Sequence, residues 1–303
     1  MAPARPGRGH LTTERVHPGT ADLDTLDTLA AVRAVQAEDA TIHGPLAAAA
    51  PAIAAAVDLV AARLSRGGRL IYVGAGTSGR LAALDAAECP PTFRSDPRQV
   101  QALVAGGRAA LTGAVEGAED DADAARAGLG ALEVGADDVV FAIAAGGTTT
   151  FAHAAVTHAR ARGAATVFLA CVPASEAPDE ADLSIRAVTG PEVLAGSTRL
   201  KAGTATKLVL NTVTTLAFAR LGKVHGNLMV DVETGGNAKL AERGTRLVAR
   251  LCEVDPERAA ALLEAAGGRV KVAVVMHARG LSRAAAEHTL AEHGNVLRAA
   301  LAG

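Results

Sequence analysis

The stretch from Arg69 to Phe93 constrains the fold more than any other part of the chain. A short apolar run, Leu70 to Val73, is followed by the glycine loop Gly74 to Gly79 and then by residues of helical composition from Arg80 to Ala87. This order predicts a strand, a tight loop and the first turn of a helix. Unpaired N–H groups at a helix start, with the positive end of its dipole behind them, bind anions.

The glycine loop is therefore predicted to bind an anionic ligand. Two of its residues carry hydroxyl groups that can donate to phosphate oxygens. The residues predicted to bind the ligand here are Gly76, Thr77, Ser78 and Gly79. In the alternative interpretation Ser78 is only an N-cap, a role that serine fills often.

The loop also matches the dinucleotide fingerprint G-x-G-x-x-G. That fingerprint expects an acidic residue about twenty positions further on, at the end of the second strand, to hold a ribose. Here the second apolar run, Val100 to Ala105, ends in Gly106 and Gly107, and Asp96 lies before it. The sequence therefore favours a phosphorylated small molecule over NAD.

Apolar runs and helical stretches alternate along the rest of the chain, which predicts a parallel sheet covered on both faces. We expect an α/β fold with five parallel strands flanked by helices. The further strands are predicted at residues 100–105, 139–144, 166–172 and 183–188, and the helices at 25–39, 53–64, 109–119, 121–132 and 150–162. Ligands bind such sheets at the carboxyl ends of the strands.

Further candidate ligand residues follow the third strand and the last one. The third strand ends in a second glycine and threonine loop, and a polar segment opens a long helical run within residues 190–219. The candidates are Gly146, Gly147, Thr148, Thr149, Ser197 and Lys201. In the alternative interpretation the second loop is a routine turn and Lys201 is a solvated helix lysine.

Composition excludes several classes of function. The net charge is −2, so no basic excess supports nucleic-acid binding. The three cysteines, Cys89, Cys171 and Cys252, are far apart and indicate neither a disulfide framework nor a zinc site. The Ala-rich run 46–64 is interrupted by Pro51, Asp58 and Arg63 and is not expected to span a membrane. We predict a cytoplasmic protein without metal or cofactor.

The chain is predicted to have four parts. Residues 1–10 read as a disordered tail without an apolar signal segment, 11–66 as helices packed on the core, and 67–252 as the ligand-binding domain. From Asp255 the caps and glycine breaks predict three short helices, so residues 253–303 form a helical appendage whose pattern resembles a ubiquitin-associated domain.

Four long motifs resemble the N-acetylmuramic acid 6-phosphate etherase family. They lie at residues 74–93, 114–120, 190–210 and 221–232, and the likeness runs from about Leu11 to the C-terminus. The resemblance implies a sugar isomerase (SIS) fold and a homodimer. It also implies cleavage of the lactyl ether of N-acetylmuramic acid 6-phosphate to N-acetylglucosamine 6-phosphate and D-lactate, a step in cell-wall amino sugar recycling.

The resemblance also implies two catalytic carboxylates. Glu88 matches the family's proton donor, and Glu119 matches its second carboxylate, interpreted as the base that removes the C2 proton. Taken without the family, Glu88 is a helix-end carboxylate and Glu119 belongs to a solvated acidic run. If Ser78 opens the helix, Glu88 lies roughly 15 Å further along its axis, longer than the phosphate-to-C3 span of a hexose phosphate. We therefore expect an active site shared between the two subunits of the dimer, with Glu88 serving the partner.

The second loop departs from the family pattern, because Gly146 to Thr150 replace a serine and an arginine among the usual residues. This departure puts the phosphate contact of that loop in question. Two other functions stay open. One is a non-catalytic phosphosugar sensor like the glucokinase regulatory protein. The other is an aldose–ketose phosphosugar isomerase, which would also remove a C2 proton but would release no lactate.

Overall fold

The structure is a computed structural model that describes residues 7–302 of the chain. These residues form two compact units. The first comprises residues 7–86 and 98–213, and the second comprises residues 87–97 and 214–302. Of the tail predicted at residues 1–10, residues 1–6 lie outside the described residues, whereas residues 7–10 have defined contacts, including one between the His10 ring and the Glu176 carbonyl.

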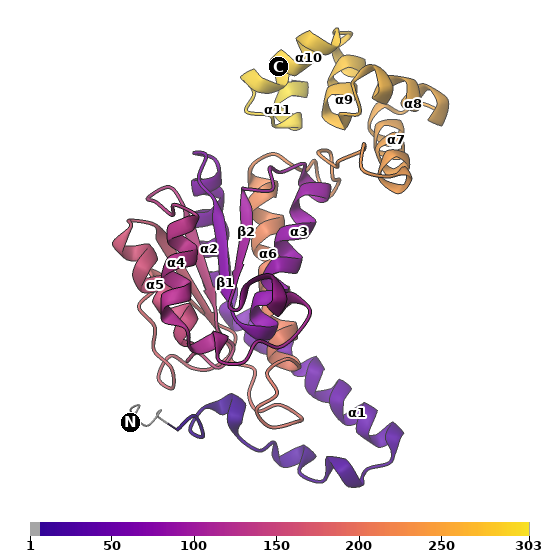
Figure 1. Cartoon of the computed structure of the whole chain (residues 1–303). Coiled ribbons are helices and arrows are strands. Elements are labelled where there is room, and N and C mark those ends of the chain that lie inside the picture. Colours follow the sequence, from indigo (N-terminus) through magenta and orange to yellow (C-terminus); the bar gives the residue numbers. More distant parts are fainter. Residues whose placement is uncertain (1–6, 303) are drawn as a thin grey trace. The chain divides into compact units, whose positions relative to one another are not determined.

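The first unit is built on a five-stranded sheet in which every neighbouring pair of strands is parallel (Figure 1). The spatial order is β2-β1-β3-β4-β5, so the chain reverses direction across the sheet at β1. The strands are β1 (Leu70–Gly74), β2 (Val100–Val104), β3 (Val139–Ile143), β4 (Ala165–Ala170) and β5 (Leu183–Arg186). The predicted fold class is confirmed.

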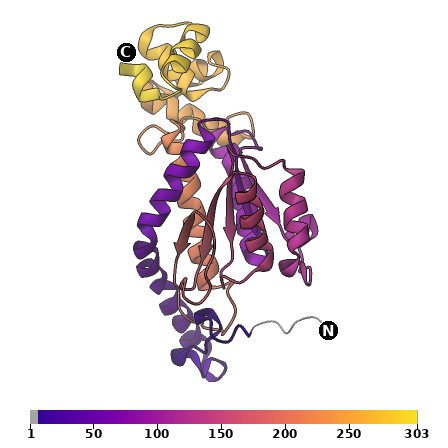
Figure 2. The same cartoon turned by 90° about the vertical axis from the view of Figure 1, so that its left-hand side faces the viewer.

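Helices cover both faces of this sheet (Figure 2). On one face α4 and α5 pack against the side chains of Ile71, Val73 and Val140. Helix α2 packs on the other face, against β3 and β5. The helices of this unit are α1 (Thr28–Asp39), α2 (His43–Leu64), α4 (Ala122–Ala131) and α5 (Thr150–Ala161), and α3 (Gly76–Phe93) and α6 (Lys201–Arg220) begin in it. Short 3₁₀ turns lie at Thr12–Glu14, Pro18–Thr20, Leu23–Thr25, Ala40–Ile42, Gly107–Leu111 and Ala118–Asp120.

One predicted helix is wrong. Residues 109–119 form no α-helix, because 109–111 and 118–119 belong to two 3₁₀ turns and 112–117 form the loop between them. Gly106, Gly107 and Gly117 have positive φ angles of 82°, 66° and 75°, a conformation that stops helix propagation. Helix α3, predicted over Arg80 to Ala87, is longer at both ends and continues through Pro90 and Pro91.

The second unit is a helical cluster with its own apolar core. Its helices are α7 (Ala238–Cys252), α8 (Pro256–Ala265), α9 (Val270–Arg279), α10 (Arg283–Glu292) and α11 (Leu297–Ala302). The predicted caps are confirmed, since Asp255 accepts from the Arg258 N–H and Ser282 from the Ala285 N–H. Helix α11 was not predicted. The domain limits proposed from the sequence stay a prediction.

Helices α1 and α2 include the most apolar helical stretch among the described residues. The segment Thr28–Leu64 is long and apolar enough to pass a length and composition criterion for crossing a membrane, although core helices of globular proteins pass it too. Helix α2 buries Ile53, Val57 and Val60, whereas α1 buries none of its residues.

Candidate active site at the carboxyl ends of the strands

The first glycine loop is tight because two of its backbone segments touch. A Cβ atom on Gly79 would lie 2.6 Å from the Gly74 carbonyl oxygen and 2.7 Å from Cγ1 of Val104. Gly76, with a φ of 54°, is the first residue of α3. Thr77 and Ser78 therefore lie in the first turn of the helix, and Ser78 is not an N-cap. Their position places them beside the unpaired N–H groups of the helix start.

A cavity of about 510 Å³ opens beside this loop. Its wall includes Gly76, Thr77 and Arg80 on one side and the segment 114–120 on the other. The structure thus brings Glu119 together with two of the predicted ligand residues. Glu116 and Asp120 line the same cavity. The site combines helix N–H groups, a threonine hydroxyl, a guanidinium group and carboxylates.

Arg80 holds the acidic segment in place. Its Nε donates to the carbonyl of Ala110 at 2.9 Å, and its Nη2 donates to the carbonyl of Gly113 at 2.6 Å. An arginine at the fifth position of α3 thereby fixes the loop that leads to Glu119. This role could not be predicted from the sequence, because nothing in the residue pattern shows which carbonyl groups a helix arginine reaches.

Glu119 lies in the 3₁₀ turn Ala118–Asp120. Its Oε1 accepts from Nη1 of Arg8 at 3.2 Å, and both side chains are nearly half exposed, at 46% and 44%. Asp120 lies 3.9 Å from the same arginine. An exposed ion pair of this kind is weak. The Glu119 carboxylate can therefore give up its contact with Arg8 and contact a different group.

The second glycine loop is built differently. Gly147 has a φ of 75°, and a Cβ there would lie 2.5 Å from that of Ala177. Its carbonyl lies 2.7 Å from Nε2 of His153. Gly146 faces the N-terminal arm, near Thr13. The predicted ligand residues Gly146, Gly147, Thr148 and Thr149 are not among those that line the Glu119 cavity.

The start of α6 contacts the first loop, since a Cβ on Gly203 would lie 3.4 Å from Cγ2 of Thr77. Lys201, a predicted ligand residue, is buried, and its Nζ lies 2.7 Å from Glu38. Ser197 is half-buried, and its N–H donates to Leu194.

Glu192 is a buried carboxylate that the sequence analysis did not single out. It accepts hydrogen bonds from the N–H groups of Lys201 and Ala202 at the start of α6, at 3.0 and 2.9 Å. Burial raises the pKa of Glu192, although these hydrogen bonds oppose the shift. Its place nine residues before the helix gives no recognisable capping signal.

Glu88 belongs to the second unit, where it is an exposed residue in the later part of α3.

Among the described residues no group of three or more His, Cys, Asp or Glu side chains is placed to hold a metal ion. Cys171 is fully buried, and desolvation raises the pKa of its thiol to about 12. It is therefore no nucleophile near neutral pH.

The chain is similar to known proteins over nearly its full length. A relative from Gloeobacter violaceus named N-acetylmuramic acid 6-phosphate etherase is 54% identical over 98% of this chain and 96% of its own length. This chain belongs to the N-acetylmuramic acid 6-phosphate etherase family. An etherase of the same name from a Synechococcus strain is 52% identical over 97% of this chain and 93% of its own.

Two family models match parts of this etherase-family chain. The SIS domain model matches residues 120–216, and the model of the glucokinase regulatory protein N-terminal SIS domain matches residues 52–159. Among solved structures, a phosphoheptose isomerase from Francisella tularensis aligns with 64% of this chain and 100% of its own, at 15% identity and a TM-score of 0.47.

Proposed function

We propose that this chain cleaves the D-lactyl ether of N-acetylmuramic acid 6-phosphate and gives N-acetylglucosamine 6-phosphate and D-lactate. The observation that carries the proposal is the near full-length identity of 54% to a relative of that name. The geometry supports it, because the cavity beside the first glycine loop combines an anion-binding helix start with a carboxylate that can act as a base.

The chemistry requires a base and an acid. An ether resists direct hydrolysis, but the C3 oxygen lies β to the C1 carbonyl once the sugar ring opens. Removal of the C2 proton then expels the lactyl oxygen and leaves a double bond between C2 and C3. Water adds its oxygen to C3, and C2 regains a proton. We assign removal of the C2 proton to Glu119 and protonation of the departing oxygen to Glu88.

The phosphate group is assigned to the first glycine loop. The N–H groups at the start of α3 and the Thr77 hydroxyl can donate to its oxygens, and Glu119 lines the same cavity. Gly146 to Thr149 and Ser197 stay predicted ligand residues. Lys201 stays one too, although a ligand would have to compete with Glu38 for its ammonium group.

We further propose that the active enzyme is a homodimer with a shared site. Helix α1 runs away from the sheet (Figure 1) and leaves apolar side chains in water, with Leu29 58% and Val32 45% exposed. Apolar side chains exposed together on one helix indicate a protein interface. In such a dimer, Glu88 of one subunit would reach the Glu119 cavity of the partner subunit.

The reaction is tested by incubating the purified protein with N-acetylmuramic acid 6-phosphate in deuterated, ¹⁸O-labelled water. We expect D-lactate, together with N-acetylglucosamine 6-phosphate that carries deuterium at C2 and ¹⁸O at C3. Deuterium exchange without lactate would indicate an isomerase. The match to the glucokinase regulatory protein domain favours one alternative, a phosphosugar sensor, which would bind the compound without lactate release or exchange.

The shared site is tested by mixing two inactive variants, Glu88→Ala and Glu119→Ala, and isolating the heterodimer by two affinity tags. If each site takes one glutamate from each subunit, the heterodimer has one intact site and regains up to about half of the wild-type activity. A pure heterodimer without activity would contradict the shared site.

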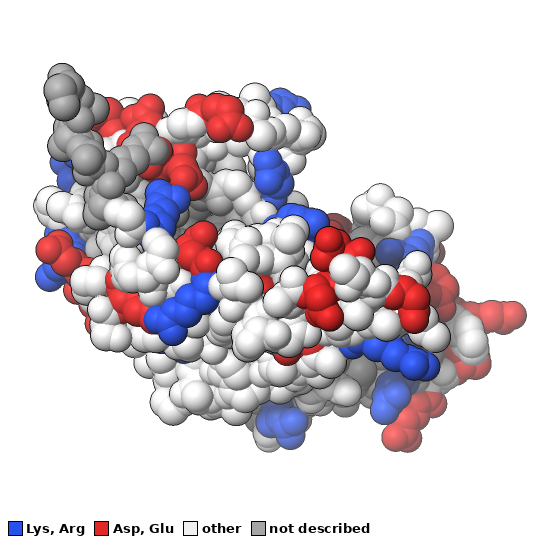
Figure 3. Space-filling view, turned by 90° about the horizontal axis from the view of Figure 1, so that it is seen from below, with Lys and Arg blue, Asp and Glu red and all other residues white. Residues whose placement is uncertain are grey.

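A cytoplasmic location is also proposed. Cys89, Cys171 and Cys252 form no disulfide bond, which is typical of proteins from reducing compartments. Charges of both signs are interspersed on the face of the molecule shown in Figure 3, without a continuous basic field for an anionic surface. Fractionation of cells that express the tagged chain tests this, and recovery in the membrane or secreted fraction would contradict it.

A further inference from the structure

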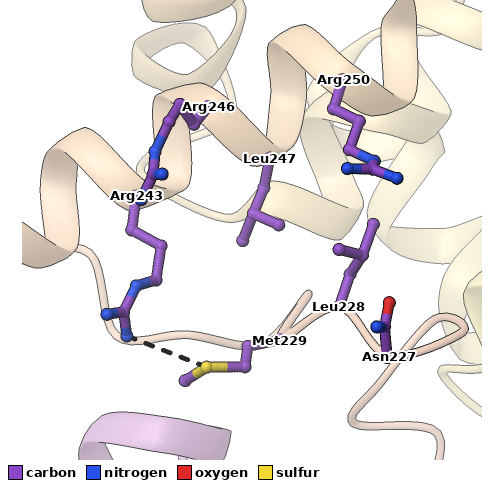
Figure 4. A pocket seen from close by; sticks show the side chains of 7 residues that line it. All are labelled: Asn227, Leu228, Met229, Arg243, Arg246, Leu247 and Arg250. Atoms are coloured by element: carbon purple, nitrogen blue, oxygen red, sulfur yellow. Dashed lines mark hydrogen bonds between the residues drawn. The ribbon is translucent and has the colours of Figure 1, made fainter.

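A second cavity, of about 510 Å³, lies wholly within the helical unit and takes no part in the proposed reaction (Figure 4). One wall is a face of α7, which contributes Arg243, Arg246 and Arg250. The opposite wall is the segment 227–229. Ligand sites commonly have volumes of about 300 to 1,000 Å³, so a small organic molecule fits here.

The arginines converge because of the helical repeat. Residues 243, 246 and 250 lie three, four and seven positions apart and therefore share one face of the helix. Arg243 and Arg250 extend from α7 toward the segment 227–229, with Leu247 between them (Figure 4). Seven residues correspond to about 10 Å along the axis. Both guanidinium groups lie on the wall of the cavity that faces the segment 227–229.

These positive charges are poorly neutralised by the protein itself. Among the described residues, neither Arg243 nor Arg250 forms an ion pair with a carboxylate, and Nη1 of Arg243 lies 3.8 Å from the Met229 sulfur. Arg246 pairs with Glu242 on its own helix at 2.8 Å, but both side chains are more than 60% exposed, so this pair is weak. A cavity lined by charges of one sign concentrates counter-ions.

The opposite wall is rigid and partly apolar. His225 and Leu228 exchange two backbone hydrogen bonds of 3.0 Å, and the N–H of Val232 donates to the Met229 carbonyl. Leu228, Met229 and Leu247 present apolar side chains to the cavity, and the exposed amide of Asn227 lies at its edge. The ligand therefore has two parts, an anionic group for the arginines and an apolar group for these side chains.

We propose that this cavity is a second binding site, which takes a small molecule bearing a phosphate group next to an apolar group. Arginine suits this ligand because its planar guanidinium forms paired hydrogen bonds with phosphate oxygens. The proposal does not depend on the etherase reaction, since it uses no residue of the Glu119 cavity.

The chain offers a local probe for this site. It contains three methionines, Met1, Met229 and Met276, of which Met229 lines the cavity. The full-length protein is labelled with ¹³C at the methionine methyl groups, and the Met229 signal is assigned with Met229→Leu. Phenyl phosphate is then titrated and compared with inorganic phosphate and with benzyl alcohol, which carries no charge.

We expect phenyl phosphate to shift the Met229 signal to saturation, inorganic phosphate to do so at a concentration at least 10-fold higher, and benzyl alcohol to leave it in place. The double variant R243Q/R250Q should weaken phenyl phosphate binding at least 10-fold, and R250Q alone should weaken it measurably. The control R258Q/R298Q removes the same charge from exposed positions of the same unit and should bind like wild type. A Met229 signal that does not move, or moves equally in R243Q/R250Q, would overturn the proposal.

Discussion

The ammonium nitrogen of Lys201, the first residue of α6, lies 2.7 Å from a carboxylate oxygen of Glu38 near the end of α1. The Lys201 side chain is 4% exposed and that of Glu38 21%. His17 approaches the other oxygen of Glu38 at 3.2 Å. The hydrogen bond from Lys201, with smaller contributions from the charges of Lys201 and His17, lowers the pKa of Glu38 against the effect of burial. Lys201 therefore ties α1 to α6.

Glu38→Gln is expected to lower the free energy of unfolding by about 1 to 3 kcal/mol, because it leaves the buried ammonium group of Lys201 without its counter-charge. Chemical denaturation of the two proteins at pH 7 measures this. Glu257→Gln, at an exposed position of α8, is the matched control and should change the stability by less than about 0.5 kcal/mol. Equal effects of the two substitutions would mean that the Lys201 pair contributes nothing specific.

Arg80→Gln is expected to lower kcat/KM for lactate release by about 10- to 100-fold, since the loop before Glu119 loses its two hydrogen bonds to the guanidinium group. The thermal midpoint should fall by only a few degrees. Arg108→Gln in the same loop removes an exposed arginine and should keep wild-type activity. If Arg80→Gln were as active as Arg108→Gln, the tether would have no catalytic role.

Gly79→Ala is expected to destabilise the protein by about 1 to 3 kcal/mol, because its Cβ would overlap the Gly74 carbonyl oxygen, 2.6 Å away. Ligand binding at the first loop should weaken as the loop is forced open. Gly130→Ala in α4 meets no atom within 4 Å, and replacing glycine there should leave stability unchanged or raise it by up to about 1 kcal/mol. A thermal melt of each variant decides the point, and a stable Gly79→Ala protein would contradict the close approach.

Asp138 provides a test of pH dependence. Burial alone would raise its pKa, but hydrogen bonds from Arg69 and from the Gly135 N–H lower it below the usual range. A carboxylate with a lowered pKa stabilises the fold above the pKa that it has in the unfolded chain, about 3.9, and this stabilisation is lost as the pH falls through the lowered value.

Asp138→Asn should accordingly cost about 2 to 4 kcal/mol of stability at pH 7. The difference from wild type should stay constant down to about pH 5 and shrink below about pH 4. Urea unfolding between pH 3 and pH 7 measures it. A difference that grows as the pH falls would show that the sign of the Asp138 shift is wrong.

The sheet could be predicted from the sequence because its strands are continuous apolar runs separated by helices. Buried parallel strands such as Val139–Ile143 have no polar face. They can therefore be recognised in the sequence as continuous apolar runs. The first glycine loop was equally clear, since Gly79 must lie within contact distance of the preceding strand. Glu88 and Glu119 were identified by family resemblance, because each is an ordinary acidic residue by composition and spacing.

Other parts of the site could not be predicted, because they depend on tertiary contacts. Residues 109–119 have helical composition, yet the positive φ angles of Gly106, Gly107 and Gly117 prevent a helix there. The contacts of Arg80, Arg8 and Glu192 join residues from 9 to 111 positions apart. No local pattern marks such partners, and the same holds for the pairing of Lys201 with Glu38.

The assignment of C2 proton removal to Glu119 is tested by deuterium incorporation at C2 of the sugar in deuterated water. The comparison is between Glu119→Gln and Glu116→Gln, two carboxylates that line the same cavity. Glu119→Gln should lose at least 100-fold in the rate of C2 deuteration and of lactate release together. Glu116→Gln should stay within about 10-fold of wild type. Wild-type deuteration by Glu119→Gln would contradict the assignment.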